Sequence, residues 1–427
     1  MCADPVNRFQ HLRSLELTCG KIPPPAVDAL LTLILHSSLA LDSLTLQDAD
    51  AMLKSTLTSA PSPSSVVHGG QLDQLPLIDA FTGLTTIRHL AIRGHCDLHA
   101  WRVIKSIRSP LKTVSIEFRA SLGPVLTVNE LLRRNPIITL ASHSATLEEI
   151  SGKHFAMHAQ EGPLGTVLEE CLARTVYPAV RTIATTLGHL LIPRTAQLIA
   201  AFPNLTRLSL TPPINCAASE VSSRMEREMW RRLWQRELQE LYTPGQTWAH
   251  LEELEGSLAD IIVLGLLDCH VPTVRLTEAL SEPLEYEHVK TVLEDIHPTE
   301  LAITVSGAST FGEMMRPVLS DASAQQLRAM EVELVFTSAE RNMNVRMVLN
   351  DVAATLAVLP LHRVALTLNY EFLDAQEVAE RHGCSVPVES SVSSLDAMTI
   401  RALFRAAIPS LITDVVFRCM CSTGSAP

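Results

Sequence analysis

A short phrase of apolar residues returns along the whole chain, and it limits the possible folds more than any other feature of the sequence. Its clearest copy is FPNLTRLSL (202–210), where Leu205, Leu208 and Leu210 follow the spacing apolar, two, apolar, one, apolar. The period of two over Leu208 and Leu210 predicts a short strand with one buried face. Pro212 ends the strand, because proline cannot donate to a strand ladder. We therefore expect the three leucines in the core of a repeated unit.

The phrase recurs from residue 11 to the last thirty residues. Further copies are HLRSLEL, ALDSLTL, TTIRHLAI, SPLKTVSI, HLEELEG, VPTVRL, TELAITV, LRAMEVEL, LHRVALTL and LITDVVF. Two weaker copies, TLEEISG and AVRTIAT, lack the third apolar residue, and HLEELEG has only Leu251 and Leu254. Most intervals between copies fall between 20 and 36 residues, and helix-forming stretches lie between them. This pattern predicts an α/β solenoid over 1–427, a curved array with a parallel sheet on the concave face and helices on the convex face.

The composition agrees with a solenoid, in which each repeat contributes a thin layer of the core. Hydrophobic residues make up 47% of the chain but aromatic residues only 4%, so the core must be built from aliphatic side chains. Two segments interrupt the array. The Ser/Pro-rich stretch 54–70 has no periodicity and is expected to be a mobile loop. The charged stretch 219–242 is expected to be an inserted amphipathic helix.

Phrases such as FPNLTRLSL, FQHLRSLEL and LTTIRHLAI resemble the leucine-rich-repeat regions of fungal F-box-type proteins. The resemblance covers nearly the whole chain, although an F-box motif is not found in it. It implies a leucine-rich-repeat solenoid that recognises substrates for an F-box-type ubiquitin ligase. A free-standing scaffold or adaptor without a link to a ligase is the alternative.

The sequence contains no motif for catalysis or for a cofactor. GASTFGEM (307–314) has the glycine spacing of a phosphate loop, but Glu313 stands where a lysine must meet the phosphates. SPLK (109–112) matches Ser-x-x-Lys, but Pro110 removes the helical context that this chemistry needs. We expect a protein that is not an enzyme and binds no cofactor.

Histidine and cysteine positions give a weaker indication of a metal site. His154 and His158 are four residues apart, which on a helix would place both rings on one face, with Glu161 as a third ligand. A second group consists of His89, His95, Cys96 and His99. Neither group has the companion ligands of a zinc site, so structural roles are favoured. A metal-binding protein or an enzyme at these positions is the less favoured alternative.

The charge is uneven along the chain, whose formal net charge is -12. Residues 1–217 hold 18 Lys and Arg against 16 Asp and Glu, a net of +2. Residues 218–427 hold 16 against 30, a net of -14. An acidic half argues against binding of nucleic acid, which needs a basic surface. We expect a protein partner with a basic segment.

Two sets of residues are candidates for partner binding. Residues between the buried positions of each strand must point away from the core. The charged ones among them are Arg207, Glu253, Glu255, Arg275, Glu331 and Glu333. The second set is the tryptophan face of 219–242, with Trp230 and Trp234. Packing of this face on the array is favoured over docking, because amphipathic helices mostly face their own core.

The sequence also indicates where the protein acts. The first residues, MCADPVNRFQHL, lack the basic and apolar regions of a signal peptide. The longest apolar run, 29–41, is too short to span a bilayer. The nine cysteines have no dense spacing pattern and read as reduced thiols. We expect an intracellular protein, cytoplasmic or nuclear, without membrane contact; the sequence does not indicate its oligomeric state.

Overall fold

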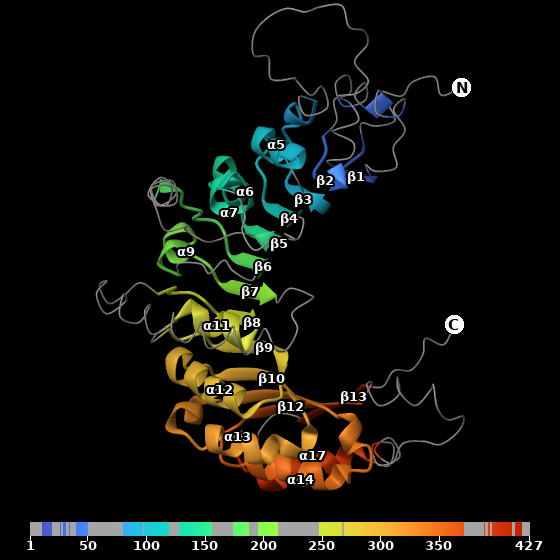
Figure 1. Cartoon of the computed structure of the whole chain (residues 1–427), viewed down its shortest axis with the longest axis vertical. Coiled ribbons are helices and arrows are strands. Elements are labelled where there is room, and N and C mark those ends of the chain that lie inside the picture. Colours follow the sequence, from blue (N-terminus) through green and yellow to red (C-terminus); the bar gives the residue numbers. More distant parts are fainter. Residues whose placement is uncertain are drawn as a thin grey trace, which may run out of the picture. The chain divides into compact units, whose positions relative to one another are not determined.

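Short strands recur along the chain, one for each copy of the apolar phrase (Figure 1). The computed structural model describes residues 11–18, 26, 29–30, 34, 40–49, 80–96, 98–118, 128–155, 174–187, 195–211, 247–266, 269–370, 388, 392, 395–411 and 415–420. The strands are β1 (Ser14–Thr18), β2 (Ser43–Gln47), β3 (His89–Cys96), β4 (Thr113–Phe118), β5 (Glu149–Phe155), β6 (Thr182–Leu187), β7 (Arg207–Thr211), β8 (Glu253–Gly256), β9 (Thr273–Leu280), β10 (Glu300–Ser306), β11 (Ala329–Val335), β12 (Arg363–Asn369) and β13 (Val415–Met420). The Ser/Pro-rich stretch 54–70 and the charged stretch 219–242 lie outside the described residues.

Helices alternate with these strands. They are α5 (Leu98–Ser106), α6 (Val128–Arg134), α7 (Pro136–Thr139), α9 (Thr195–Ala201), α11 (Leu258–Leu264), α12 (Pro283–Ile296), α13 (Phe311–Leu319), α14 (Val345–Leu356) and α17 (Ala397–Ala407). Short 3₁₀ turns occur at Ala141–His143, Ala308–Thr310, Ala322–Gln326 and Ser338–Glu340. No helix in these ranges is long and apolar enough to cross a membrane.

The helix ends follow local chemistry. Helix α11 begins at the Ser257 cap, whose hydroxyl accepts from the Asp260 amide, and ends at Gly265 in the left-handed conformation. Proline opens α12, where Glu282 and Glu285 form a capping box. These signals place helix starts and stops between the strands, as an alternating α/β repeat requires.

The strands form one sheet whose order follows the sequence from β1 to β13, and every defined register between neighbours is parallel. The expected fold class, an α/β solenoid with a parallel sheet, is confirmed. The chain divides into two compact units. The first carries β1 to β6, the second carries β8 to β13, and β7 is divided between them after Leu208.

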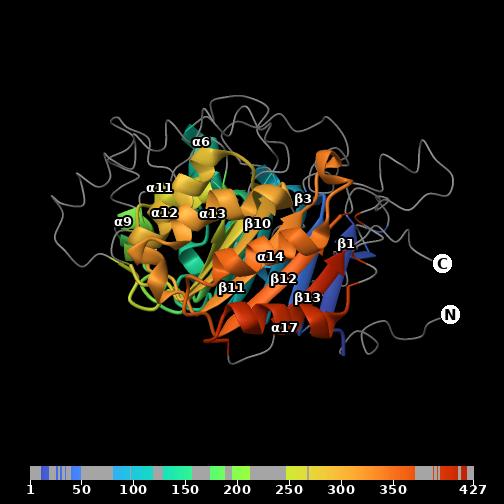
Figure 2. The same cartoon turned by 90° about the horizontal axis from the view of Figure 1, so that it is seen from below.

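The apolar phrase forms the core. Leu205, Leu208 and Leu210 are all buried, with exposed fractions of 0%, 2% and 1%. In the second unit α12, α13 and α14 follow one another along one face of the strands and contact each other in turn (Figures 1 and 2). Side chains at alternate strand positions point to this helix face and are buried, and those between them point away.

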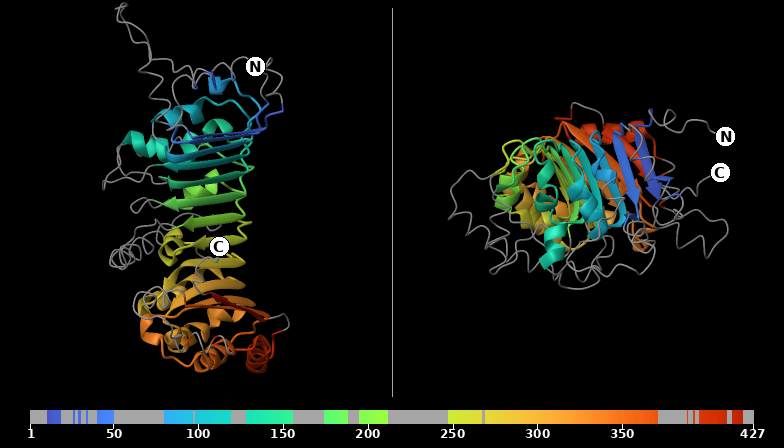
Figure 3. Two further views of the ribbon diagram at one scale, coloured as in Figure 1. Left: turned by 90° about the vertical axis from the view of Figure 1, so that its right-hand side faces the viewer. Right: turned by 90° about the horizontal axis from the view of Figure 1, so that it is seen from above.

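At nine junctions between coils in the described part of the chain, one backbone carbonyl accepts from two successive amides at the start of the next strand. The oxygen of Arg13, directly before β1, accepts from the amides of Asp42 and Ser43, at 2.8 and 3.0 Å. The same double acceptance recurs at the oxygens of Asp42, Arg88, Lys112, Glu148, Arg181, Pro272, Thr299 and Arg328. This contact fixes the register at the start of each strand, and Figure 3 shows the resulting stack of parallel strands within each unit.

One of the weak copies of the phrase, TLEEISG, has a packing explanation. In TLEEISG the third apolar position is Gly152, and a Cβ there would meet the carbonyl oxygen of Ile116 and the ring of Phe155. Phe155 is fully buried and packs edge-to-face on Phe118, with ring centroids 5.7 Å apart. A ring from three residues downstream therefore occupies the volume of the missing aliphatic side chain.

Candidate interaction surface on the strand face

The strand face is defined here as the side of β8 to β12 that points away from the helices. Five of the charged residues expected to bind a partner alternate with buried residues on these strands: Glu253, Glu255, Arg275, Glu331 and Glu333. Arg207 lies on β7, at a position that belongs to the first unit. Trp230 and Trp234 lie outside the described residues. The structure thus brings five of the eight expected residues onto one face of one unit.

Arg275 is the centre of this face. Its Nε lies 3.4 Å from Oε1 of Glu253, and its NH1 donates to Oε2 of Glu331 at 3.1 Å. Partial burial disfavours the charged guanidinium, but the hydrogen bond and charge of Glu331, with a contribution from Glu253, raise the pKa of Arg275 above its usual value. Glu253 and Glu331, two of the four glutamates expected to bind a partner, therefore share the Arg275 guanidinium.

The Arg275–Glu331 contact spans a whole strand. In the parallel register Arg275 on β9 lies beside Ala302 on β10, and Ala302 lies beside Glu331 on β11. The two charged residues are thus two strand spacings apart, roughly 9.6 Å between backbones. The methyl side chain of Ala302 leaves room for the guanidinium to cross above it.

A second ion pair repeats this arrangement two residues along the strands, in the next row on the same face. Arg363 on β12 donates to Oε2 of Glu300 on β10 at 2.7 Å. Ala329 on β11 lies between them in the register and is only 6% exposed. The two pairs together cover the alanines and hold β9 to β12 through side chains as well as through backbone hydrogen bonds.

The other two glutamates keep their charge. Oε2 of Glu255 accepts from the hydroxyl of Ser209 at 2.8 Å. Glu333 accepts from Asn369 at 2.7 Å and from Thr304 at 3.4 Å. All three donors are neutral, so these contacts orient the two carboxylates without cancelling their charge. Glu255 and Glu333 thus differ from Glu253 and Glu331 in having neutral donors, although Arg275 lies beside Glu255 in the strand register.

The corresponding face of the first unit is different in character. Ala91, Ser115 and Ser151 lie side by side on β3, β4 and β5 and form the floor of a hollow of about 210 Å³. His89 and Glu149 stand at its side. Small side chains thus line this hollow, while the Glu117–Lys153 ion pair lies further along the same strands.

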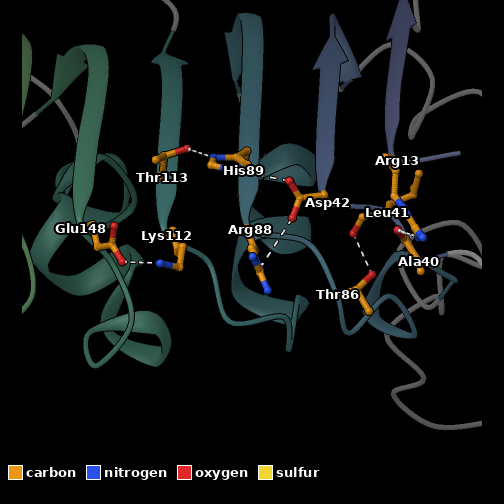
Figure 4. A network of polar contacts seen from close by, with 10 residues as sticks. All are labelled: Arg13, Ala40, Leu41, Asp42, Thr86, Arg88, His89, Lys112, Thr113 and Glu148. Carbon is orange, nitrogen blue, oxygen red and sulfur yellow. Dashed lines mark hydrogen bonds and ion pairs between the residues drawn. The ribbon is translucent and has the colours of Figure 1, made fainter.

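A row of polar contacts runs along the edge of this hollow (Figure 4). Nδ1 of His89 lies 2.8 Å from the hydroxyl of Thr113, and its Nε2 lies 3.7 Å from Asp42. Next to it Lys112 pairs with Glu148 at 2.6 Å. Each contact joins neighbouring coils, so the row stabilises the stack of strands.

The histidine groups do not assemble into a metal site within the described ranges, where no cluster of three His, Cys, Asp or Glu has suitable geometry. His154 lies on β5 with a φ of 60°, so the helical spacing considered for it and His158 does not apply there. His158 and Glu161 lie outside the described residues. Cys96 is buried at the end of β3, whereas His89 is on the strand face.

Sequence reasoning missed the bridging residues Ala302, Ala329, Glu300 and Arg363. A signal for them was present, because Ala302 and Arg275 hold the same position in successive copies of the phrase. Aligning the copies places Ala302 beside both Arg275 and Glu331. Only the folded structure shows that the side chains of Arg275 and Glu331 then meet above Ala302.

Comparison with known proteins gives a distant structural likeness. The chain is similar to the crystal structure of the leucine-rich repeat-containing protein LegL7 from Legionella pneumophila, at 13% identity. The match covers 90% of this chain and 98% of that one, with a TM-score of 0.41. No family model matches the sequence, and no curated protein matches it.

Proposed function

We propose that the protein is an interaction module whose second unit binds a basic segment of a protein partner on its strand face. The observation that carries this proposal is that Glu255 and Glu333 accept hydrogen bonds from neutral donors and, within the described residues, are in no ion pair. An oriented carboxylate loses little conformational entropy when a cationic side chain pairs with it.

The spacing of the two carboxylates indicates the form of the ligand. Glu255 is on β8 and Glu333 on β11, three strand spacings away and two residues further along in the strand register, which is roughly 16 Å between backbones. Four residues of an extended chain cover about 14 Å, and the long side chains of Lys or Arg span the rest. A partner segment with two Lys or Arg residues separated by three others therefore suits the strand face.

A labelled peptide tests this proposal. A fluorescein-labelled peptide with the repeat Lys-Ser-Ser-Ser is titrated with the full chain and followed by anisotropy. Replacing both carboxylates (Glu255→Gln with Glu333→Gln) should weaken binding about tenfold, which corresponds to about 1.4 kcal/mol. The affinity of the parent protein should fall as salt rises, because exposed charges are screened.

A matched control separates a local effect from net charge. Glu287 on α12 and Glu313 on α13 are exposed on the helix face of the same unit. Changing both to Gln removes the same charge and should leave the affinity nearly unchanged. Equal weakening by the two double variants would refute a specific site on the strand face.

The resemblance to the repeat regions of fungal F-box-type proteins adds a narrower hypothesis. In that role the captured protein is a substrate delivered to a ubiquitin ligase. The alternative is a free-standing scaffold that joins proteins without a ligase. An in-frame F-box in the transcript that encodes this chain would favour the first role, and a transcript without one would favour the scaffold.

A further inference from the structure

Positive charge gathers on the helix-bearing side of the first unit. The segments 98–110 and 128–147, which contain α5, α6 and α7, hold five cationic residues and a single carboxylate, that of Glu130. We call the following group the basic cluster: Trp101, Arg102, Lys105, Arg108, Arg133 and Arg134. If the charge of Glu130 is subtracted from the five positive charges, a net charge of +4 remains.

Trp101 organises this cluster. Its ring is half-buried, with the Lys105 ammonium and the Arg133 guanidinium each 5.7 Å from the ring centroid. Its Nε1 donates to the hydroxyl of Thr139 at 3.3 Å, which fixes the ring plane. Cations held over an indole in this way gain about 0.5–1 kcal/mol at exposed sites. Both cations are thereby held against the same ring.

Neighbouring contacts hold the cluster in place on the fold. The Lys105 ammonium donates to the carbonyl of Ile138 at 2.8 Å, close to the end of α7. The Arg134 guanidinium lies 5.9 Å from the centroid of the Phe118 ring. Among the described residues no ion pair with a carboxylate is formed by Arg102, Arg108 or Arg133; Arg108 is exposed, and Arg102 and Arg133 are half-buried.

The chemistry of the ligand follows from the type and number of charges. A planar guanidinium binds carboxylate through two parallel hydrogen bonds, and three such groups suit several carboxylates in a row. The chain as a whole carries -12, and residues 218–427 carry -14. This net charge repels a long polyanion such as nucleic acid, whereas a short acidic segment meets mainly the local field.

We propose that the basic cluster is a second docking surface, which binds an Asp/Glu-rich segment of a protein partner. This second surface goes beyond the proposed function, because the basic cluster lies in the first unit rather than the second. It would also bind an acidic segment, whereas the strand face would bind a basic one. The chain then joins one partner through a basic segment and another through an acidic one.

A second labelled peptide tests this inference on the full chain. A fluorescein-labelled twelve-residue peptide of alternating Asp and Glu is titrated by anisotropy. Arg102→Gln with Arg108→Gln should weaken its binding about fivefold, by analogy with two exposed ion pairs. The control is Arg346→Gln with Arg405→Gln on α14 and α17, which removes the same charge and should leave the affinity within about twofold. Equal losses in both variants would overturn the proposal.

A charge-conserving change tests the role of the guanidinium. Arg133→Lys keeps the charge but loses the planar fork, so it should weaken the acidic peptide about threefold with unchanged melting. If Arg133→Lys binds the acidic peptide as tightly as the parent protein does, positive charge alone is sufficient for binding. That result would overturn recognition of carboxylates by the Arg133 guanidinium. Two further outcomes would also contradict the inference: tighter binding of a twelve-nucleotide RNA, or self-association of the protein that Arg102→Gln with Arg108→Gln abolishes.

Discussion

Arg275 and Glu331 form an ion pair across the strand that lies between them. The guanidinium on β9 reaches the carboxylate on β11 at 3.1 Å, over Ala302 on β10. Glu253 adds a second carboxylate to the same cation. The strand face of the second unit is therefore an organised network, in which Glu253 and Glu331 share one cation while Glu255 and Glu333 accept from neutral donors.

A double-mutant cycle measures this ion pair. Arg275→Ala, Glu331→Ala and the double variant, compared by urea unfolding, should give a coupling energy of about 0.3–1 kcal/mol, because the pair is partly exposed. In a background with Ala302→Leu the coupling should fall to near zero, since the larger side chain blocks the crossing. A coupling energy that the Leu substitution leaves unchanged would contradict the path over Ala302.

Restoring the apolar consensus at Gly152 should destabilise the protein. Gly152→Leu completes the phrase in the sequence, but its side chain would meet the Ile116 carbonyl and the buried Phe155 ring. Overpacking of this kind costs about 1–3 kcal/mol. Thermal or urea unfolding measures the change. An increase in stability would show that the ring of Phe155 does not fill this volume.

The apolar phrase is enough to predict the strands, the buried leucines and the parallel order, because each depends on local spacing. The network of Arg275 and Glu331 could not be predicted in the same way, since its members are 56 residues apart and meet only through the register. Phe155 illustrates the same limit. Its sequence position suggests nothing about Gly152, and only the turn of the chain at the end of β5 brings the two together.

Glu340 should make stability depend on acid pH. Its side chain is 6% exposed and accepts from the Ser309 amide at 2.7 Å and from the Thr337 amide at 2.9 Å. Burial by itself would raise the pKa of Glu340, but these hydrogen bonds outweigh it and the pKa lies below its usual value.

The sign of the effect follows from this lowered pKa. The carboxylate stabilises the fold above the unfolded-state pKa of about 4.3, and this contribution is lost as the pH falls through the folded-state pKa. Glu340→Gln should therefore cost about 1–3 kcal/mol near neutral pH, and less in acid. The exposed Glu313→Gln serves as the control. A cost for Glu340→Gln that stays constant down to acid pH would rule out this linkage.

Two cysteines should differ sharply in reactivity. Cys269 is buried, and burial raises the pKa of its thiol to about 11. Cys419 on β13 is exposed. Because the thiolate is the reactive form, iodoacetamide near pH 8 should label Cys419 first and Cys269 only after unfolding. Peptide mapping by mass spectrometry follows both sites, and equally fast labelling in the folded protein would place Cys269 at the surface.

Site-specific photocrosslinking tests the central claim, capture of a basic segment on the strand face, most directly. A benzophenone amino acid replaces Thr304, which lies beside Glu333 on that face, or Thr291 on α12 as the control. Irradiation with the Lys-Ser-Ser-Ser peptide should give a crosslink from position 304 that disappears with Glu255→Gln and Glu333→Gln, and none from position 291. Equal crosslinking from both positions, or a crosslink from position 304 that survives both substitutions, would contradict the account.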